Sequence, residues 1–242
     1  MALRSKEKRR IRRNQEETFE KLYSASNRND ILQFLPKTRR QSDLWDSLTE
    51  NVVTIAVGSA GTGKTLTALW WGLSEWSKGR YEKIYYVRSD VGVDHQRGRG
   101  ALPGSMEDKM LPLLGPLWDN LPLMTRSRGA ADYLLKNEIV KPILLEDIRG
   151  RSFNNSFVIF DEAQNSSVDQ CKTVLSRVGE NSKMVITGDT RQIDLHVFSR
   201  SSRLLDAYNR LADIGGIGRV QFTNDDVVRN GIIADILYAY ES

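Results

Sequence analysis

Eight consecutive residues, 58–65, read Gly-Ser-Ala-Gly-Thr-Gly-Lys-Thr and match the phosphate-binding pattern G-x-x-x-x-G-K-[ST] at every fixed position. The glycines allow the backbone to wrap around an anion and to turn its N–H groups inward. Lys64 would place a positive charge beside the β- and γ-phosphates of a nucleotide, and the Thr65 hydroxyl would coordinate Mg²⁺. The alternative is a glycine-rich turn with a chance lysine, and the elements predicted on both sides of the loop argue against it.

A pair of carboxylates follows an apolar run further along the chain. Residues 157–160 are Phe-Val-Ile-Phe, and Asp161 and Glu162 come next. An acid at the end of a buried strand lies at the rim where open α/β sheets bind ligands. We expect Asp161 to hold Mg²⁺, through water, and Glu162 to polarise the attacking water as general base. The alternative is that both carboxylates only solvate the end of the strand.

A third group of polar residues, Thr-Gly-Asp-Thr-Arg-Gln at 187–192, also follows an apolar run. It resembles motif III of superfamily-one helicases, in which the glutamine senses the γ-phosphate and links hydrolysis to movement. The resemblance implies that role for Gln192. Asp189 taken alone is explained as a turn former.

Hydrolysis of this kind also needs positive charge on the developing transition state. The candidate arginines are Arg149, Arg151, Arg203 and Arg229. An arginine supplied by a neighbouring subunit would make activity depend on assembly, and the sequence does not choose among the four. The candidate catalytic set is Lys64, Glu162, Gln192 and Arg229.

The spacing of apolar residues predicts the elements that position these groups. We predict strands at 52–57, 84–87, 157–160, 184–187 and 218–222. We predict helices at 14–34, around 44–48, directly after the glycine-rich loop, and at 106–121, 167–179, 201–213 and 227–240. Strands that alternate with helices predict an α/β fold in which helices cover both faces of a parallel sheet of about five strands.

The chain of 242 residues is long enough for one substantial core. We divide it into a basic N-terminal helical extension at 1–40 and a nucleotide-binding domain at 41–242. The region 89–150 is rich in Gly, Pro and basic residues, and we expect it to be an insert that carries function.

Composition narrows the class of protein further. With 40% hydrophobic and 27% charged residues, the chain has no apolar stretch near the roughly 20 residues that cross a bilayer. We therefore expect a cytoplasmic protein with no membrane partner. Cys171 stands alone, which excludes an intramolecular disulfide. Between Arg4 and Arg13 there are seven Lys/Arg residues and one acid, typical of either a solubilising tail or a nucleic-acid contact.

The three polar groups resemble those of one family, the PhoH-like P-loop ATPases, over about residues 34–241. The motifs that carry the resemblance are Gly58–Thr65, Leu102-Pro103-Gly104 with Glu107 and Lys109, Arg149-Gly150-Arg151, Asp161-Glu162-Ala163-Gln164-Asn165, Thr187-Gly188-Asp189 with Gln192-Ile193-Asp194-Leu195, and Asp226-Val227-Val228-Arg229. Two departures are Ser59, where the family usually has proline, and the basic stretch 91–100.

The resemblance implies a RecA-like domain that binds ATP with Mg²⁺, assembles as a homo-oligomer in a hexameric ring, and associates with RNA. It also implies that Gln41 reads adenine, as a glutamine does in related helicases. The expected nucleotide-binding residues are Gln41, Gly58, Ser59, Ala60, Gly61, Thr62, Gly63, Lys64 and Thr65, and the expected metal ligands are Thr65 and Asp161.

Three functions fit these observations. The first is an ATP-driven enzyme that acts on RNA or single-stranded DNA, and this length requires it to oligomerise if it translocates. The second is an ATP-dependent switch or assembly factor with a protein partner. The third is a kinase, which Glu162 disfavours because it points to water as the acceptor.

Overall fold

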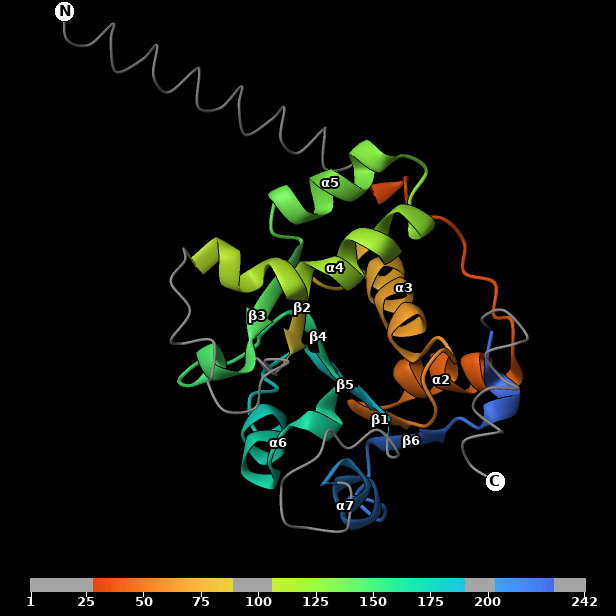
Figure 1. Cartoon of the computed structure of the whole chain (residues 1–242), viewed down its shortest axis with the longest axis vertical. Coiled ribbons are helices and arrows are strands. Elements are labelled where there is room, and N and C mark those ends of the chain that lie inside the picture. Colours follow the sequence, from red (N-terminus) through yellow and green to blue (C-terminus); the bar gives the residue numbers. More distant parts are fainter. Residues whose placement is uncertain (1–27, 89–105, 190–202, 229–242) are drawn as a thin grey trace, which may run out of the picture.

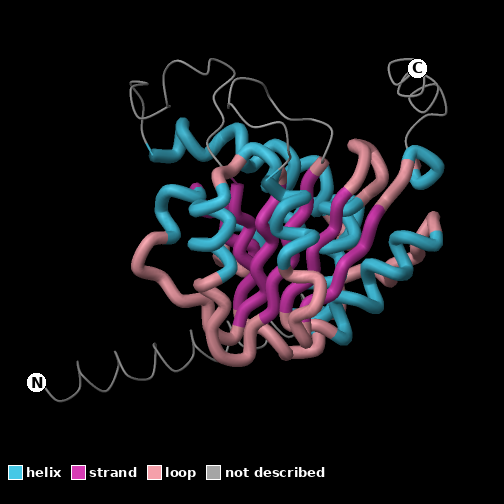
Figure 2. The backbone as a smooth tube through the Cα atoms, turned by 90° about the horizontal axis from the view of Figure 1, so that it is seen from below, coloured by secondary structure: helices cyan, strands magenta, loops and turns pink. Residues whose placement is uncertain are grey.

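The computed structural model describes residues 28–88, 106–189 and 203–228. Its centre is a single sheet whose strands run side by side (Figure 2). The strands are β1 Val53–Val57, β2 Lys83–Arg88, β3 Val140–Leu144, β4 Ser156–Asp161, β5 Lys183–Gly188 and β6 Ile217–Gln221. The strands lie in the order β3-β2-β4-β5-β1-β6, and every neighbouring pair is parallel. All six strands therefore end at the same edge of the sheet.

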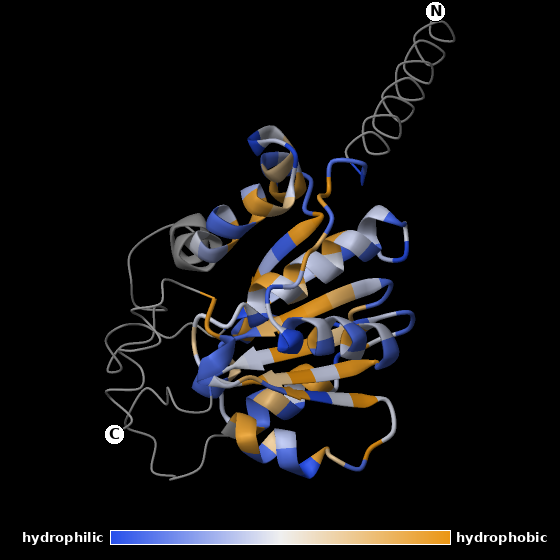
Figure 3. Ribbon diagram, turned by 90° about the vertical axis from the view of Figure 1, so that its right-hand side faces the viewer, coloured by the Kyte–Doolittle hydropathy of each residue, from blue (hydrophilic) through white to orange (hydrophobic). Residues whose placement is uncertain are grey.

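Helices cover both faces of this sheet (Figure 1). They are α2 Arg39–Glu50, α3 Lys64–Ser77, α4 Met106–Met124, α5 Arg128–Lys136, α6 Val168–Leu175 and α7 Arg203–Arg210, with 3₁₀ turns η2 Leu145–Ile148, η3 Ala163–Asn165 and η4 Asn224–Asp226. Figure 3 shows hydrophobic residues along the strands that these helices cover.

Alternation along β4 shows how the two faces are divided. Phe157 and Ile159 pack in a core with residues of α2 to α5, whereas Val158 and Phe160 pack in a second core with residues of α6 and α7. Successive side chains of a strand point to opposite faces, so an unbroken apolar run buries both. The unbroken apolar run at 157–160 therefore contributes to both cores.

The predicted α/β fold is confirmed, and the five predicted strands correspond to β1, β2, β4, β5 and β6. The sheet has one strand more than predicted, β3, which lies in the region 89–150 together with α4 and α5. The pattern Val-Lys-Pro-Ile-Leu hid this strand, because proline cannot donate to a sheet ladder. Pro142 is tolerated because β3 is an edge strand.

Other predicted elements match in part. The helices predicted around 44–48, after the loop, and at 106–121, 167–179 and 201–213 correspond to α2, α3, α4, α6 and α7. The helices predicted at 14–34 and 227–240 lie largely outside the described residues. The described part of the first is wrong over 29–34, which forms a turn and an isolated bridge from Ile31 to Thr125 in place of a helix. The division at residue 40 falls inside α2, and residues further upstream contact the end of α4, where the Leu32 N–H donates to the Met124 carbonyl (2.8 Å). Among the helices of the described residues, none combines the length and apolarity that a membrane span needs.

A substitution of Phe157 tests the packing of α3 against the sheet. Its side chain is fully buried, and its ring centroid lies 4.8 Å from that of Trp71. Phe157→Ala should lower the free energy of unfolding by about 3–5 kcal/mol, because it removes buried area and leaves a cavity. Urea unfolding followed by circular dichroism measures this loss.

The matched control for this change is Leu35→Ala, at a side chain that is 72% exposed. It should change stability by no more than about 0.5 kcal/mol. A loss below about 1 kcal/mol for Phe157→Ala would contradict the described packing.

Candidate nucleotide-binding site

The loop of residues 58–65 joins β1 to α3, at the carboxyl edge of the sheet. All three of its glycines have positive φ: Gly58 at 139°, Gly61 at 79° and Gly63 at 84°. L-residues rarely adopt this conformation, so the backbone itself requires glycine there. A Cβ at Gly58 would also overlap the carbonyl oxygen of Phe222. Helix α3 begins at Lys64, so its free N-terminal amides face the space that the loop encloses.

The segment after β6 holds the loop from one side. The Val228 N–H donates to the Gly61 carbonyl (3.1 Å), and the Ser59 hydroxyl is hydrogen-bonded to the Asn224 side chain. Asn224 is 6% exposed, so this contact is shielded from water. Hydrogen bonds of Asn224 and Val228 thereby connect the segment after β6 to the phosphate-binding loop.

Gln41 holds the loop from α2. It is 2% exposed; its Nε2 donates to the Thr62 carbonyl (3.0 Å) and its Oε1 accepts from the Lys37 N–H (2.8 Å). The side chain therefore lies beside the loop, as an adenine-contacting residue must, but both ends of its amide have partners within the protein. Its contact with adenine stays a prediction.

Lys64 is folded back into its own loop. Its ammonium donates to the carbonyls of Gly58 (2.8 Å) and Ser59 (2.7 Å) and lies 3.2 Å from the Thr62 hydroxyl. Burial lowers the pKa of this ammonium below its ordinary value, and the carboxylates of Asp189 and Asp161 oppose that shift. The loop carbonyls thus stabilise a buried cation within the phosphate-binding loop.

Asp161 ends β4 and is 5% exposed. Its Oδ1 accepts from the hydroxyls of Thr65 (2.7 Å) and Thr187 (2.7 Å), and its Oδ2 accepts from the Tyr86 hydroxyl (2.5 Å). Burial, followed by the charge of Asp161, raises the pKa of Tyr86 well above its ordinary value, so Tyr86 remains a donor. A carboxylate and a hydroxyl oxygen side by side, both hard ligands, fit Mg²⁺ at Thr65 and Asp161.

Glu162 follows with a left-handed backbone conformation, φ 54°, which is uncommon for a residue other than glycine. Its Oε2 accepts from Nε2 of Gln164 (2.5 Å), and its Oε1 lies 3.5 Å from the guanidinium of Arg88. The carboxylate is 35% exposed, so a water molecule can reach it. This position suits a general base.

Asp189 comes directly after β5 and approaches the loop. Its Oδ2 accepts from the Ala60 N–H (3.0 Å), and its own N–H donates to Oε1 of Gln164 (3.1 Å). Gly188 before it lacks a side chain because a Cβ there would overlap Gln164 Oε1. The strand ends of β1, β4 and β5 are thus joined by side-chain contacts.

The structure brings the predicted loop residues, Thr65, Asp161 and Glu162 together at one edge of the sheet. Gln192 and Arg229 lie outside the described residues, and only the backbone of Arg203 is described. Arg149 and Arg151 are exposed after η2, and Arg151 Nε donates to the Asp147 carbonyl (2.9 Å).

Several residues that contact predicted site residues were not themselves predicted from the sequence: Tyr86, Gln164, Thr187, Asp189 and Asn224. Gln164 and Thr187 stand within motifs that the sequence analysis identified, so their place in those motifs was an available signal. Tyr86 and Asn224 carried no such signal, because they reach the site through the order of the strands.

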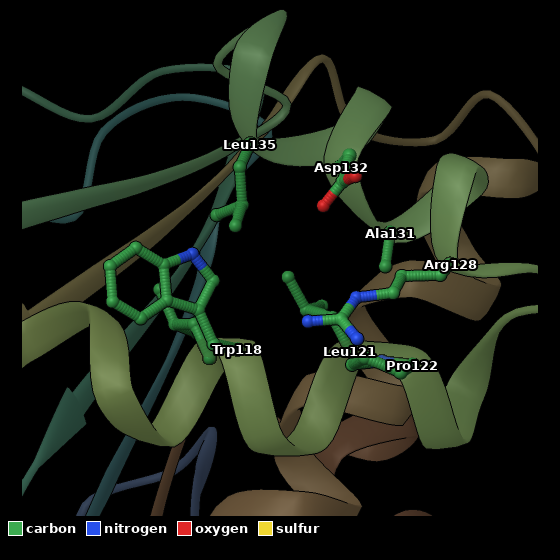
Figure 4. Close-up of a pocket in the computed structure, with 8 residues that line it drawn as sticks. Trp118, Leu121, Pro122, Arg128, Ala131, Asp132 and Leu135 are labelled. Atoms are coloured by element: carbon green, nitrogen blue, oxygen red, sulfur yellow. The ribbon is translucent and has the colours of Figure 1, made fainter.

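A separate hollow of about 230 Å³ lies between α4 and α5 (Figure 4). Trp118, Leu121 and Leu135 contribute apolar surface, and Arg128 and Asp132 contribute charge. Residues of the phosphate-binding loop and of the carboxylate pair are absent from its lining. It is therefore distinct from the nucleotide site.

The glycine-rich loop with Lys64 and Thr65 lies between a strand and a helix, and the Asp161 carboxylate of the same parallel sheet contacts it. This arrangement defines an α/β P-loop nucleotide-binding protein. Residues 33–241 match the PhoH-like protein family, and the chain belongs to that family.

Curated relatives agree with this assignment. The chain is 35% identical over 205 residues to a PhoH-like protein of Mycobacterium tuberculosis (strain ATCC 25618 / H37Rv), covering 85% of this chain and 57% of the relative. It is 35% identical over 205 residues to a PhoH-like protein of Bacillus subtilis (strain 168), covering 85% and 63%. It is 31% identical over 220 residues to protein PhoH of Escherichia coli (strain K12), covering 89% and 60%. The chain spans less than two thirds of the length of each of these relatives.

Solved structures show more distant likenesses. The large terminase of a thermophilic bacteriophage is 12% identical with a TM-score of 0.44, covering 84% of this chain and 50% of that chain. The Pyrococcus furiosus Hef helicase domain is 14% identical with a TM-score of 0.42, covering 75% and 37%. Likenesses this distant say nothing about the activity of this protein.

A substitution at Gly58 tests the backbone conformation of the phosphate-binding loop. Gly58→Ala should weaken nucleotide binding by about tenfold or more, because φ 139° and the Phe222 carbonyl leave no place for a Cβ and the loop must move. Titration of a fluorescent ATP analogue measures the affinity.

Gly115→Ala is the matched control, since Gly115 lies in α4 and a Cβ there meets no atom within 4 Å. Its affinity for the analogue should equal that of the unmodified protein. Unchanged affinity in Gly58→Ala would refute the described loop conformation.

Proposed function

We propose that this protein hydrolyses ATP in the presence of Mg²⁺. The observation that carries the proposal is the 2.7 Å contact between the Thr65 hydroxyl of the phosphate-binding loop and the Asp161 carboxylate at the end of β4, with Glu162 directly beside it. Membership of the PhoH-like family supports an ATPase. The arrangement combines an anion-binding loop, a pair of hard metal ligands and a base, which together suit transfer of a phosphoryl group to water.

The loop binds the phosphates in this proposal. The N–H groups of the loop and of the first turn of α3 donate to phosphate oxygens, and the helix dipole favours negative charge there. Lys64 already lies in the loop, bonded to two carbonyls and a hydroxyl. We propose that its ammonium exchanges these partners for the β- and γ-phosphates.

Thr65 and Asp161 would hold Mg²⁺, and the ion would supply charge that neutralises the phosphates. Thr187 and Tyr86 keep the Asp161 carboxylate oriented, because both of its oxygens accept from these fixed hydroxyls. Glu162 would accept the proton of the attacking water, since its carboxylate is partly open to solvent. We also propose three further roles: Gln192 senses the γ-phosphate, Arg229 supplies positive charge to the transition state, and Gln41 contacts adenine.

We further propose that hydrolysis is coupled to RNA or single-stranded DNA in a homo-oligomeric, hexameric ring. The basic N-terminal segment and the helicase-like motif at 187–192 support this reading. A ring would allow one subunit to supply an arginine to its neighbour.

A second candidate is an ATP-dependent assembly or switch protein that acts on a protein partner. The observation in its favour is that two large apolar side chains of α4 are exposed, Trp118 at 49% and Leu123 at 59% (Figure 4 shows Trp118). Tryptophan is enriched at protein interfaces.

Two substitutions separate nucleotide binding from chemistry. Glu162→Gln should keep ATP affinity within about threefold and lower kcat by about 100-fold or more, because it removes the proton acceptor alone. Lys64→Ala should weaken ATP binding itself by about tenfold or more, because it removes the cation from the loop. Phosphate release and analogue titration measure the two effects.

Controls for these substitutions are Glu180→Gln and Lys136→Ala, both at exposed positions. Each should retain the activity and affinity of the unmodified protein. Normal turnover in Glu162→Gln would show that Glu162 is not the base.

Nucleic-acid coupling has its own test. Single-stranded RNA should raise the ATPase rate at low ionic strength, and the effect should decline as salt is added, because phosphate contacts release counterions. Heparin at equal charge is the control for a purely polyanionic effect. An ATPase rate unchanged by single-stranded RNA and DNA at low salt would favour the protein-partner alternative.

A further inference from the structure

Gln164 is a buried glutamine whose two amide atoms contact two different parts of the site. It lies in η3 and is 6% exposed. Its Nε2 donates to Oε2 of Glu162 (2.5 Å), and its Oε1 accepts from the Asp189 N–H (3.1 Å). Because a backbone N–H can only donate, Oε1 must face Asp189 and Nε2 must face Glu162. The amide therefore has one defined orientation.

The space around this amide restricts it further. Gly188, the last residue of β5, would overlap Gln164 Oε1 if it carried a Cβ, and the same Cβ would lie 2.6 Å from Leu204 of α7. The Gln164 side chain thus fills the gap that the glycine leaves between β5 and η3. A side chain packed in this way cannot change rotamer without displacing its neighbours.

Glu162 depends on this contact for its position. Its carboxylate is 35% exposed, and the Arg88 guanidinium near its Oε1 is 3.5 Å away and itself 26% exposed. Ion pairs open to solvent fix a side chain weakly. The shorter contact to a buried amide, which engages Oε2, is the stronger restraint.

We propose that Gln164 is a positioning residue that holds Glu162 in place as general base and connects it to the phosphate-binding loop. The connection runs from Glu162 through Gln164 to Asp189, whose carboxylate accepts from the Ala60 N–H (3.0 Å). The base and the loop are thereby held in one frame across β4, β5 and β1. This inference rests on the proposed function, since it requires Glu162 to act as the base.

Two variants of Gln164 test the proposal. Gln164→Met keeps the length of the side chain and removes both hydrogen bonds. Gln164→Glu keeps the shape, removes the amide donor and places a second carboxyl group against Glu162. Both should lower kcat by about 10- to 100-fold, because a misplaced base loses its alignment with the water. The KM for ATP and the affinity for a fluorescent ATP analogue should stay within about threefold, because the phosphate contacts remain.

A double-mutant cycle distinguishes positioning from a general structural role. Single-turnover hydrolysis of radiolabelled ATP is measured for Glu162→Gln alone and together with Gln164→Met. If Gln164 acts through Glu162, the second substitution should lower the remaining rate by no more than about twofold. Gln33→Met, at an exposed glutamine outside the site, is the control and should leave kcat unchanged. Thermal unfolding of each variant ensures that rates are compared well below its Tm.

The kinetic results distinguish failure of the role proposed for Gln164 from failure of the proposed ATPase function. Normal kcat in folded Gln164→Met and Gln164→Glu, with Glu162→Gln inactive, overturns the role of Gln164 and leaves the ATPase proposal intact. Losses that multiply in the double variant also overturn it, since Gln164 would then act independently of Glu162. An unmodified protein without ATPase activity, or an active Glu162→Gln, overturns the proposed function and this inference together.

Discussion

The carboxylate of Asp161 is the group around which the site is built. It is buried at the end of β4, and three hydroxyls donate to it, from Thr65 at the start of α3, Thr187 in β5 and Tyr86 in β2. A buried charge is tolerated only when it is paired or well hydrogen-bonded. Each hydroxyl therefore stabilises the charge, and the charge fixes the three elements relative to one another.

Sheet topology makes this convergence possible. β5 lies between β1 and β4, and β2 lies on the other side of β4, so all the strand ends that carry site residues are adjacent. The same order places Asp189 beside the loop residue Ala60 and Gln164 beside Glu162. A phosphate ligand that shifts the loop would therefore also act on Asp189, Gln164 and Glu162, because hydrogen bonds connect these residues to the loop.

How much the sequence predicts depends on the range of the interaction. The loop, Asp161 and Glu162 were predictable because short local sequence patterns that follow apolar strands identify them. β3 was missed because a proline, here Pro142, is untypical of a strand unless the strand lies at the edge of a sheet. The neighbouring helix α5 was also missed. Tyr86 was missed as a partner of Asp161 because that contact depends on the pairing of β2 with β4, which no local pattern encodes.

The most direct test is a crystal structure with a non-hydrolysable ATP analogue and Mg²⁺. We expect phosphates within the loop of residues 58–65, the Lys64 ammonium turned from the loop carbonyls to the phosphates, and the metal held at Thr65 and Asp161. Phosphates bound outside this loop, or a metal ion remote from both residues, would contradict it.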